Sequence, residues 1–400
     1  MTERTQKRML GVLSFFLLAT VVTPQRIASL SPAQQRIAAA QSAIAAKPGE
    51  FQLHNELAAA LISRARETSD PNYFDRAEVA VEKSLQLSPE NFNGAVLDAT
   101  VLLGKHEFVK SLAEAKVLNK RSGDDLRVYA LIAENDIALG DYKNAEPAAQ
   151  WMLDLRANNP QSLLHGAILR ELFGDPEGAI DLMTSAYLKS PANDTEERAW
   201  ILTRAARMQL RMGKLAAAEA QALNALSQFA DYPYAINTLA RVRMAQAKYK
   251  DAVALLRKLS PAPANLYLLG QALESDGQTK AAADAFADFE QRARAEIGQP
   301  LNANRDLVLY YAGAGKKPAE ALRIERLEAA KRQDVRTLDA LAWALYANGD
   351  YAEARKQIDK VLAVGVRDSG FFGHASRIYA KLDDAAAAEK YAKLSRELTP

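Results

Sequence analysis

Apolar residues recur along almost the whole chain at the three- and four-residue spacing of helices that bury one face. From about residue 32 to Pro400, such stretches alternate with short breaks at Gly, Asp or Pro, and Ala, Leu, Glu, Lys and Arg dominate the composition. Alternating runs of β-branched residues, which would indicate strands, are missing. The pattern therefore predicts an all-α chain built from many short helices.

One short motif marks the breaks between these helices. A helix ends in Gly, a charged residue and often Tyr follow, and a small Ala comes about three residues later. The clearest copies are Gly140-Asp141-Tyr142 with Ala145, Gly349-Asp350-Tyr351 with Ala354, and Lys248-Tyr249 with Ala252. Equivalent positions fall at 140, 174, 213, 247, 277, 315 and 349, so the spacing is 30 to 39 residues. A period of this size predicts a stack of helical hairpins.

The residue types of the motif have a physical reason. Gly adopts the left-handed conformation that ends the first helix and turns the chain. Small residues allow two helices to approach closely, and a Pro such as Pro89 or Pro191 stops the second helix. We expect close helix contacts at Ala145 on the second helix of its hairpin and, on first helices, at Ala133, Ala167, Ala206, Ala240, Gly270, Ala342 and Ala375.

On these copies, the chain resembles tetratricopeptide repeat (TPR) proteins. The resemblance implies an α-solenoid, a right-handed superhelix of about nine to ten TPR hairpins over residues 31–400, with two sub-arrays (about 31–300 and 301–400) as a further division. Three units depart from the pattern. Residues Arg64 to Phe74 form an insertion, Val109 stands where Ala is expected, and the unit at Gly315 has slipped by about one residue.

The N-terminus predicts export. Arg4, Lys7 and Arg8 precede an apolar run from Met9 to Val22, and a basic segment before a short apolar stretch is typical of a secretory signal peptide. Val21 is bulky for a cleavage site, so an uncleaved signal anchor is the competing interpretation. Residues 1–30 are therefore a signal peptide or signal anchor with a short linker. The rest of the chain is expected to be periplasmic or secreted, or tethered to the inner membrane through residues 9–22.

Composition and motifs point away from catalysis. The chain has no Cys, which excludes disulfides and Cys-ligated metals, and its formal charge of +2 gives no overall bias toward nucleic acid. Its four His residues form no zinc-binding helix pair, and Walker, dinucleotide and nucleophile-elbow motifs are missing. We expect His374 to be a packed, hydrogen-bonded residue. The sequence predicts no enzyme activity, no catalytic residue, no metal, no cofactor and no nucleic-acid partner.

The resemblance implies where a partner would bind, because the first helix of each hairpin lines the concave face in TPR proteins. Carried over position by position, it proposes as groove residues Trp200, Arg207, Arg211, Tyr234, Asn237, Arg241, Tyr267, Gln271, Trp343 and Tyr346. The aromatic members are candidate anchors of a binding hot spot. Alternatively, they fill the gaps between hairpins as part of the core.

Basic residues are concentrated in one part of this surface. Residues 198 to 258 hold eleven Lys or Arg and three acids. Arg207, Arg211, Asn237 and Arg241 are expected to lie close together, where they could bind an acidic segment or a C-terminal carboxylate. A solvated positive face without a partner is the alternative. The full Lys/Asn/Lys/Arg clamp of heat-shock-protein co-chaperones is not present.

Three functions remain open at this point. The first is a scaffold of the cell envelope that binds peptide or protein partners in its concave groove. The second is a non-catalytic subunit, or an enzyme with a site between repeats or in the insertion Arg64–Phe74, which would need clustered polar residues in a cleft. The third is a purely structural spacer.

Overall fold

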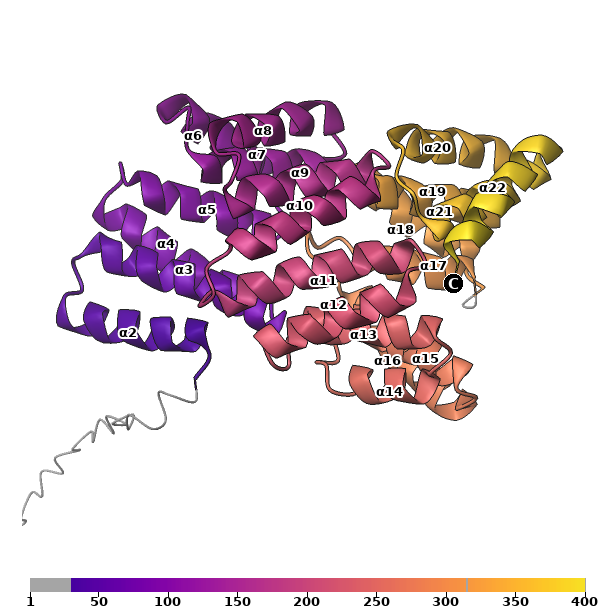
Figure 1. The fold of residues 1–400 in the computed structure, drawn as a ribbon, viewed down its shortest axis with the longest axis horizontal. Helices are drawn as coiled ribbons and strands as arrows, with labels where there is room; N and C mark the ends of the chain where they lie inside the picture. The colour runs from indigo at the N-terminus through magenta and orange to yellow at the C-terminus, as the bar shows by residue number, and fades with distance from the viewer. Residues whose placement is uncertain (1–29, 314–315, 400) are drawn as a thin grey trace, which may run out of the picture.

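The computed structural model describes residues 30–313 and 316–399, and the regular structure of these residues is entirely helical. The helices follow one another as a curved stack (Figure 1). Helix α2 (Pro32–Ala46) comes first among the described residues. Ten hairpins follow: α3 (Phe51–Thr68) with α4 (Asn72–Leu87), α5 (Phe92–Gly104) with α6 (Phe108–Arg121), α7 (Leu126–Leu139) with α8 (Tyr142–Leu155), α9 (Pro160–Leu172) with α10 (Pro176–Lys189), α11 (Thr195–Arg211) with α12 (Leu215–Gln228), α13 (Pro233–Ala245) with α14 (Tyr249–Leu256), α15 (Pro263–Ser275) with α16 (Thr279–Ala295), α17 (Asn304–Ala312) with α18 (Pro318–Ala329), α19 (Val335–Ala347) with α20 (Tyr351–Val364), and α21 (Ser369–Lys381) with α22 (Ala385–Leu398).

The turns inside the hairpins confirm the motif. Each of the predicted glycines that the structure describes has the left-handed conformation, with φ of 71° to 87° at Gly140, Gly174, Gly213, Gly277 and Gly349. An Asp directly after the turn often caps the next helix, as at Asp175, whose Oδ1 accepts a hydrogen bond from the Gly178 N–H at 2.9 Å. Sequence alone therefore located these helix boundaries.

The small residues lie where hairpins pack most closely. Ala145, Ala218 and Ala354 on second helices are fully buried, as are Ala206 and Ala342 on first helices. Apolar clusters join successive hairpins; one of them combines residues of α9, α10 and α11, including Leu163, Met183 and Met208. Each hairpin therefore covers the apolar face of the next, which confirms an α-solenoid.

Two of the irregular units differ from the sequence prediction. Val109 is exposed, and Ser111 is the small buried residue of its hairpin; its hydroxyl donates to the carbonyl of Ala99 at 2.7 Å. The insertion Arg64–Phe74 is largely helical, since α3 continues to Thr68 and α4 begins at Asn72. Gly315 lies outside the described residues.

The predicted export segment, residues 1–30 with the apolar run 9–22, also lies outside the described residues except for Leu30. Among the residues that the structure describes, no helix combines the length and apolar character needed to span a membrane.

Candidate functional site

The stack winds so tightly that its C-terminal part returns to its middle. The N–H of Gln333, before α19, donates to the carbonyl of Leu139 at the end of α7 at 3.0 Å, and the Val335 N–H donates to the hydroxyl of Tyr142 at 2.9 Å. Figure 1 shows α19 to α22 beside the hairpins of α7 to α10. We call the contact around Leu139, Tyr142, Gln333 and Val335 the seam, because it joins two turns of the superhelix.

Further contacts join helices that are far apart in the sequence. Gly174 lies so close to Gly365 that a Cβ on Gly174 would stand 2.6 Å from the Gly365 carbonyl oxygen. Nearer the N-terminus, Arg66 of α3 pairs with Glu196 of α11 at 2.9 Å, and the buried Tyr232 hydroxyl donates to the other Glu196 oxygen at 2.7 Å. The concave face is therefore narrowed to chambers between turns, whereas the sequence predicted a single groove.

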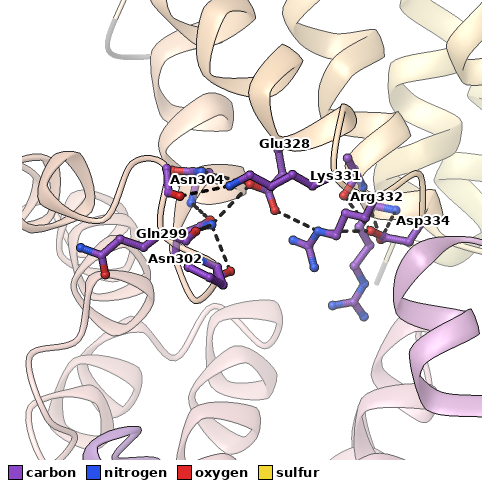
Figure 2. A network of polar contacts seen from close by, with 11 residues as sticks. Gln299, Asn302, Asn304, Glu328, Lys331, Arg332 and Asp334 are labelled. Carbon is purple, nitrogen blue, oxygen red and sulfur yellow. Dashed lines mark hydrogen bonds and ion pairs between the residues drawn. The ribbon is translucent and has the colours of Figure 1, made fainter. Parts of the chain in front are cut away.

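A polar network holds the segment that enters the seam (Figure 2). The carboxylate of Glu328 accepts hydrogen bonds from the side-chain amides of Asn304 at 3.1 Å and Asn302 at 3.3 Å. Its other oxygen lies 3.0 Å from Nε of Arg332, which is 3.6 Å from Asp334. The network thus ties the start of α17 to the end of α18 and the residues just before α19.

A chamber of about 620 Å³ is lined mainly by α3, α7, α9 and α11, which are first helices of their hairpins. We call it the aromatic chamber, because Trp200 and Tyr234 line it together with Phe74 and Phe108. Leu301, from the loop before α17, closes part of it. Its size is within the range of about 300–1,000 Å³ typical of ligand pockets, and it combines apolar walls with a few polar groups.

His165 and Glu134 supply polar groups in the wall of the aromatic chamber. The buried His165 ring has Nε2 at 3.0 Å from Glu134 and Nδ1 at 2.7 Å from the Gln161 carbonyl oxygen. Burial works against the charged imidazolium, but the Glu134 hydrogen bond and charge outweigh it and raise the pKa of His165. Two acceptors around one ring favour the doubly protonated form.

A second chamber, of about 240 Å³, lies between α9 and α11 of one turn and α19 and α21 of the other. We call it the arginine chamber, because Arg204, Arg211, Arg332 and Arg336 line it. It shares Arg204 with the aromatic chamber, so the two chambers are neighbours on one internal surface.

Acidic residues balance only part of the charge around the arginine chamber. Glu171 pairs with Arg204 at 3.4 Å and with Arg211; burial raises its pKa, but the two guanidinium groups bring it below the ordinary value. Arg207 and Arg336 have no ion pair within the described residues. Partial loss of hydration among neighbouring groups, then the charge of Arg211 and other arginines, lowers the pKa of Arg336 to about 10, although its side chain still reaches solvent.

The positive charge of the neighbouring arginines also acts on Arg207. Its pKa is lowered well below the ordinary value, first by burial and then by the charges of Arg241, Arg336 and Arg211. Guanidinium groups of α13 and α19 therefore lower the pKa of an arginine on α11, although α19 is far from α11 in the sequence. That Arg207, Arg211 and Arg241 lie close together stays a prediction. Sequence reasoning did not include Arg336, whose charge acts on Arg207 from a later turn.

All ten predicted groove residues are half-buried, but they do not gather in one place. Trp200 and Tyr234 line the aromatic chamber. Asn237 accepts a hydrogen bond from Nε of Arg241 at 3.0 Å and donates to Asn265 at 3.1 Å, so part of the predicted anion-binding set is occupied internally.

The remaining aromatic candidates belong to clusters between hairpins. The Tyr267 ring packs against Phe286, Phe289 and Tyr310, and Gln271 follows it one helical turn later. Core packing, the alternative raised by the sequence, therefore accounts for Tyr267.

In the C-terminal hairpins, Trp343 stacks between Tyr346 and His374, with ring centroids 4.8 Å and 4.2 Å apart. His374 also lies 2.7 Å from the buried Asp339 carboxylate. It is thus packed and hydrogen-bonded, as expected from the sequence.

Sequence reasoning also missed Arg66, Arg204 and Glu171. Glu171 and Arg204 lie on neighbouring hairpins and face a turn that comes some 130 residues later. No local pattern marks such residues; only the excess of basic residues on α11 pointed toward them. Among the residues that the structure describes, no three His, Asp or Glu side chains gather as metal ligands.

Comparisons with known proteins identify the fold alone. No family model and no curated protein sequence matches the chain. Human IFIT1, solved as a dimer with m7Gppp-AAAA, is 17% identical with a TM-score of 0.51 over 78% of this chain and 71% of IFIT1. TTC0263, a TPR protein of Thermus thermophilus, is 19% identical with a TM-score of 0.42 over 48% of this chain and 98% of its own. PilW, a type IV pilus biogenesis factor, is 18% identical with a TM-score of 0.42 over 55% of this chain and 99% of its own.

Proposed function

We propose, from the premise that this chain is an α-solenoid of TPR-type hairpins, that it is a non-catalytic scaffold which binds a segment of a partner protein on its concave face. The observation that carries the proposal is the pair of adjoining chambers on that face, one aromatic and one lined by arginine. Aromatic side chains beside guanidinium groups are the residue types that dominate protein-binding hot spots.

The charge of the surface supports an acidic partner segment. The charges of Arg241 and Arg211 act on the half-buried Arg207, and residues 198–258 hold eleven Lys or Arg and three acids in a chain whose net charge is only +2. A carboxylate entering this region would form charge-assisted hydrogen bonds. An apolar side chain of the same segment could occupy the aromatic chamber next to it.

We further propose that the scaffold works in the cell envelope, either exported or anchored in the inner membrane through residues 9–22. The support is the basic segment followed by the apolar run at the N-terminus. Sequencing the N-terminus of the mature protein decides between cleavage and anchoring.

Affinity capture tests the partner proposal. The full chain is immobilised and exposed to the envelope fraction of its own organism, in parallel with a double variant, Arg207→Ala with Arg241→Ala. The matched control replaces two exposed arginines, Arg257→Ala with Arg292→Ala. We expect a protein with an acidic segment to be retained by the wild type and the control but lost by the double variant. Equal retention by all three chains would reject binding through Arg207 and Arg241.

A binding measurement completes the test. A synthetic peptide of the captured acidic segment should bind the wild type with 1:1 stoichiometry and change the fluorescence of Trp200, which lines the aromatic chamber. A peptide that binds the double variant as tightly as the control variant would contradict binding on the concave face.

A further inference from the structure

The arginine chamber is built by two turns of the superhelix. Arg204 and Arg211 come from α11 in one turn, whereas Arg336 comes from the start of α19 in the next. Arg305 of α17 adds to the positive field, which Asp306 beside it offsets in part, and the Nε of Arg305 is buried without a hydrogen-bond acceptor among the described residues. Like charges thus face each other across the region where the seam brings the turns together.

The acidic residues that line the chamber do not neutralise the arginines of both turns. Glu171 is taken by Arg204 and Arg211 from its own turn. Asp334 caps α19 by accepting from the Arg336 N–H at 3.0 Å, and Asp368 caps α21 by accepting from the Gly370 N–H at 2.8 Å. Both carboxylates are therefore engaged at helix N-termini, and neither is within ion-pair distance of the Arg336 guanidinium.

Unbalanced like charges destabilise a contact, even where one of them, here Arg336, still reaches solvent. We infer that the arginine chamber is an anion site shared by two turns of the superhelix, and that an anionic group bound between Arg211 and Arg336 holds the turns closed. The identity of that group rests on the proposed function: it is a carboxylate of an acidic polypeptide segment.

The chamber itself favours a small group of a larger partner. Its volume of about 240 Å³ is below the range of about 300–1,000 Å³ usual for whole small-molecule ligands. The carboxylates of Glu171, Asp334 and Asp368 in its wall would repel a continuous phosphate backbone more than one or two isolated carboxylates. A side-chain carboxylate fits both limits.

Because a ligand that prefers the closed state must shift the chain toward it, anion binding and closure are linked. Without an anion, the seam opens more often. With one, the guanidinium groups of both turns gain a common partner, so the seam closes and the midpoint of thermal unfolding rises.

Hexaglutamate, inorganic phosphate and oligoadenylate are the probes, each added to the full chain at an ionic strength held constant with NaCl. The thermal midpoint and the hydrogen exchange of the Gln333 amide in the seam are measured. We expect hexaglutamate to raise the midpoint and slow this exchange, and phosphate to do so at higher concentration. If neither probe acts beyond NaCl, the inference is overturned; if oligoadenylate acts more strongly than hexaglutamate, the carboxylate assignment is wrong.

Arg336→Gln separates a ligand site from a structural role. The variant removes one of the repelling charges, so the free protein should be at least as stable as wild type. Its affinity for hexaglutamate should fall about tenfold or more, because hydrogen bonds to charged groups are lost. Arg257→Gln, at an exposed position, is the control and should respond like wild type. A variant that is unstable without ligand, or that still responds fully to hexaglutamate, would contradict the inference.

The outcomes also distinguish this inference from the proposed function. An Arg336-dependent response to hexaglutamate without any captured acidic partner would leave the anion site standing and reject the scaffold role. A captured partner whose binding does not affect the seam would support the scaffold role and reject the anion site as a link between turns.

Discussion

Replacing Gly140 by Ala tests the seam directly, because this glycine has no room for a side chain. Its φ is +84°, and a Cβ would lie 2.4 Å from the carbonyl oxygen of Gln333 in the next turn. Gly349 occupies the same position in a later hairpin, with φ of +81°, but a Cβ there would meet nothing within 4 Å. Gly349→Ala therefore has the same backbone strain without the clash and is the matched control.

The magnitude follows from what each variant loses. The left-handed conformation costs both alanine variants about 1–2 kcal/mol. Only Gly140→Ala must also separate the turns, which breaks the hydrogen bonds from Gln333 to Leu139 and from Val335 to Tyr142. At about 0.5–1.5 kcal/mol each, these add about 1–3 kcal/mol.

Hydrogen exchange measured residue by residue is the assay. In Gly140→Ala, the amides of Gln333 and Val335 should exchange about tenfold faster or more than in wild type, since about 1.4 kcal/mol corresponds to a factor of ten. In Gly349→Ala, these two amides should keep their protection. Equal protection of both amides in the two variants would refute the seam.

Two further predictions concern buried polar groups. Glu325 is fully buried, and burial followed by the charge of Glu328 raises its pKa well above the ordinary value, so the native state keeps its proton while the unfolded chain loses it above about pH 4. Its contribution to stability is thus complete at low pH and lost as pH rises, and the thermal midpoint of Glu325→Gln relative to wild type should increase from pH 5 to pH 8; a constant difference would contradict the assignment. Tyr232→Phe removes the donor to Glu196 at 2.7 Å and should lower the free energy of unfolding by about 1–2 kcal/mol in urea titrations, whereas an unchanged value would show that the hydrogen bond is unimportant.

The hairpins could be predicted from the sequence because local rules determine their turns and helix contacts. Gly140 and Gly349 turn the chain because only glycine adopts the left-handed conformation at low cost, and Ala145 lies at a helix contact because it is small. The unit with Ser111 lacks the Gly and Ala of the motif for a physical reason. Its turn is made by His106 with φ of 61°, and the hydroxyl of Ser111 is satisfied by the Ala99 carbonyl, so a polar residue takes the place of Ala.

The site could be predicted only in part. Arg207 and Arg211 lie on α11 and Arg241 on α13 of the next hairpin, so the repeat period predicts that they lie together. Arg336 joins them through the pitch of the superhelix, which is the sum of small rotations between hairpins over more than a hundred residues. No local pattern fixes that sum, and contacts such as Leu139 with Gln333 follow from the whole stack.

A distance between the two turns tests the central claim most directly, and the absence of native Cys makes site-specific labelling simple. Spin labels are attached to cysteines that replace the exposed residues Asp141 and Lys331, each two residues from the hydrogen bond between Leu139 and Gln333. With about 3.5 Å per residue, the two Cα atoms lie within about 20 Å of each other in the closed superhelix. Pulsed electron paramagnetic resonance should give a narrow distribution at this short distance, and narrower still with hexaglutamate. A broad distribution centred well beyond it would mean that the turns do not meet.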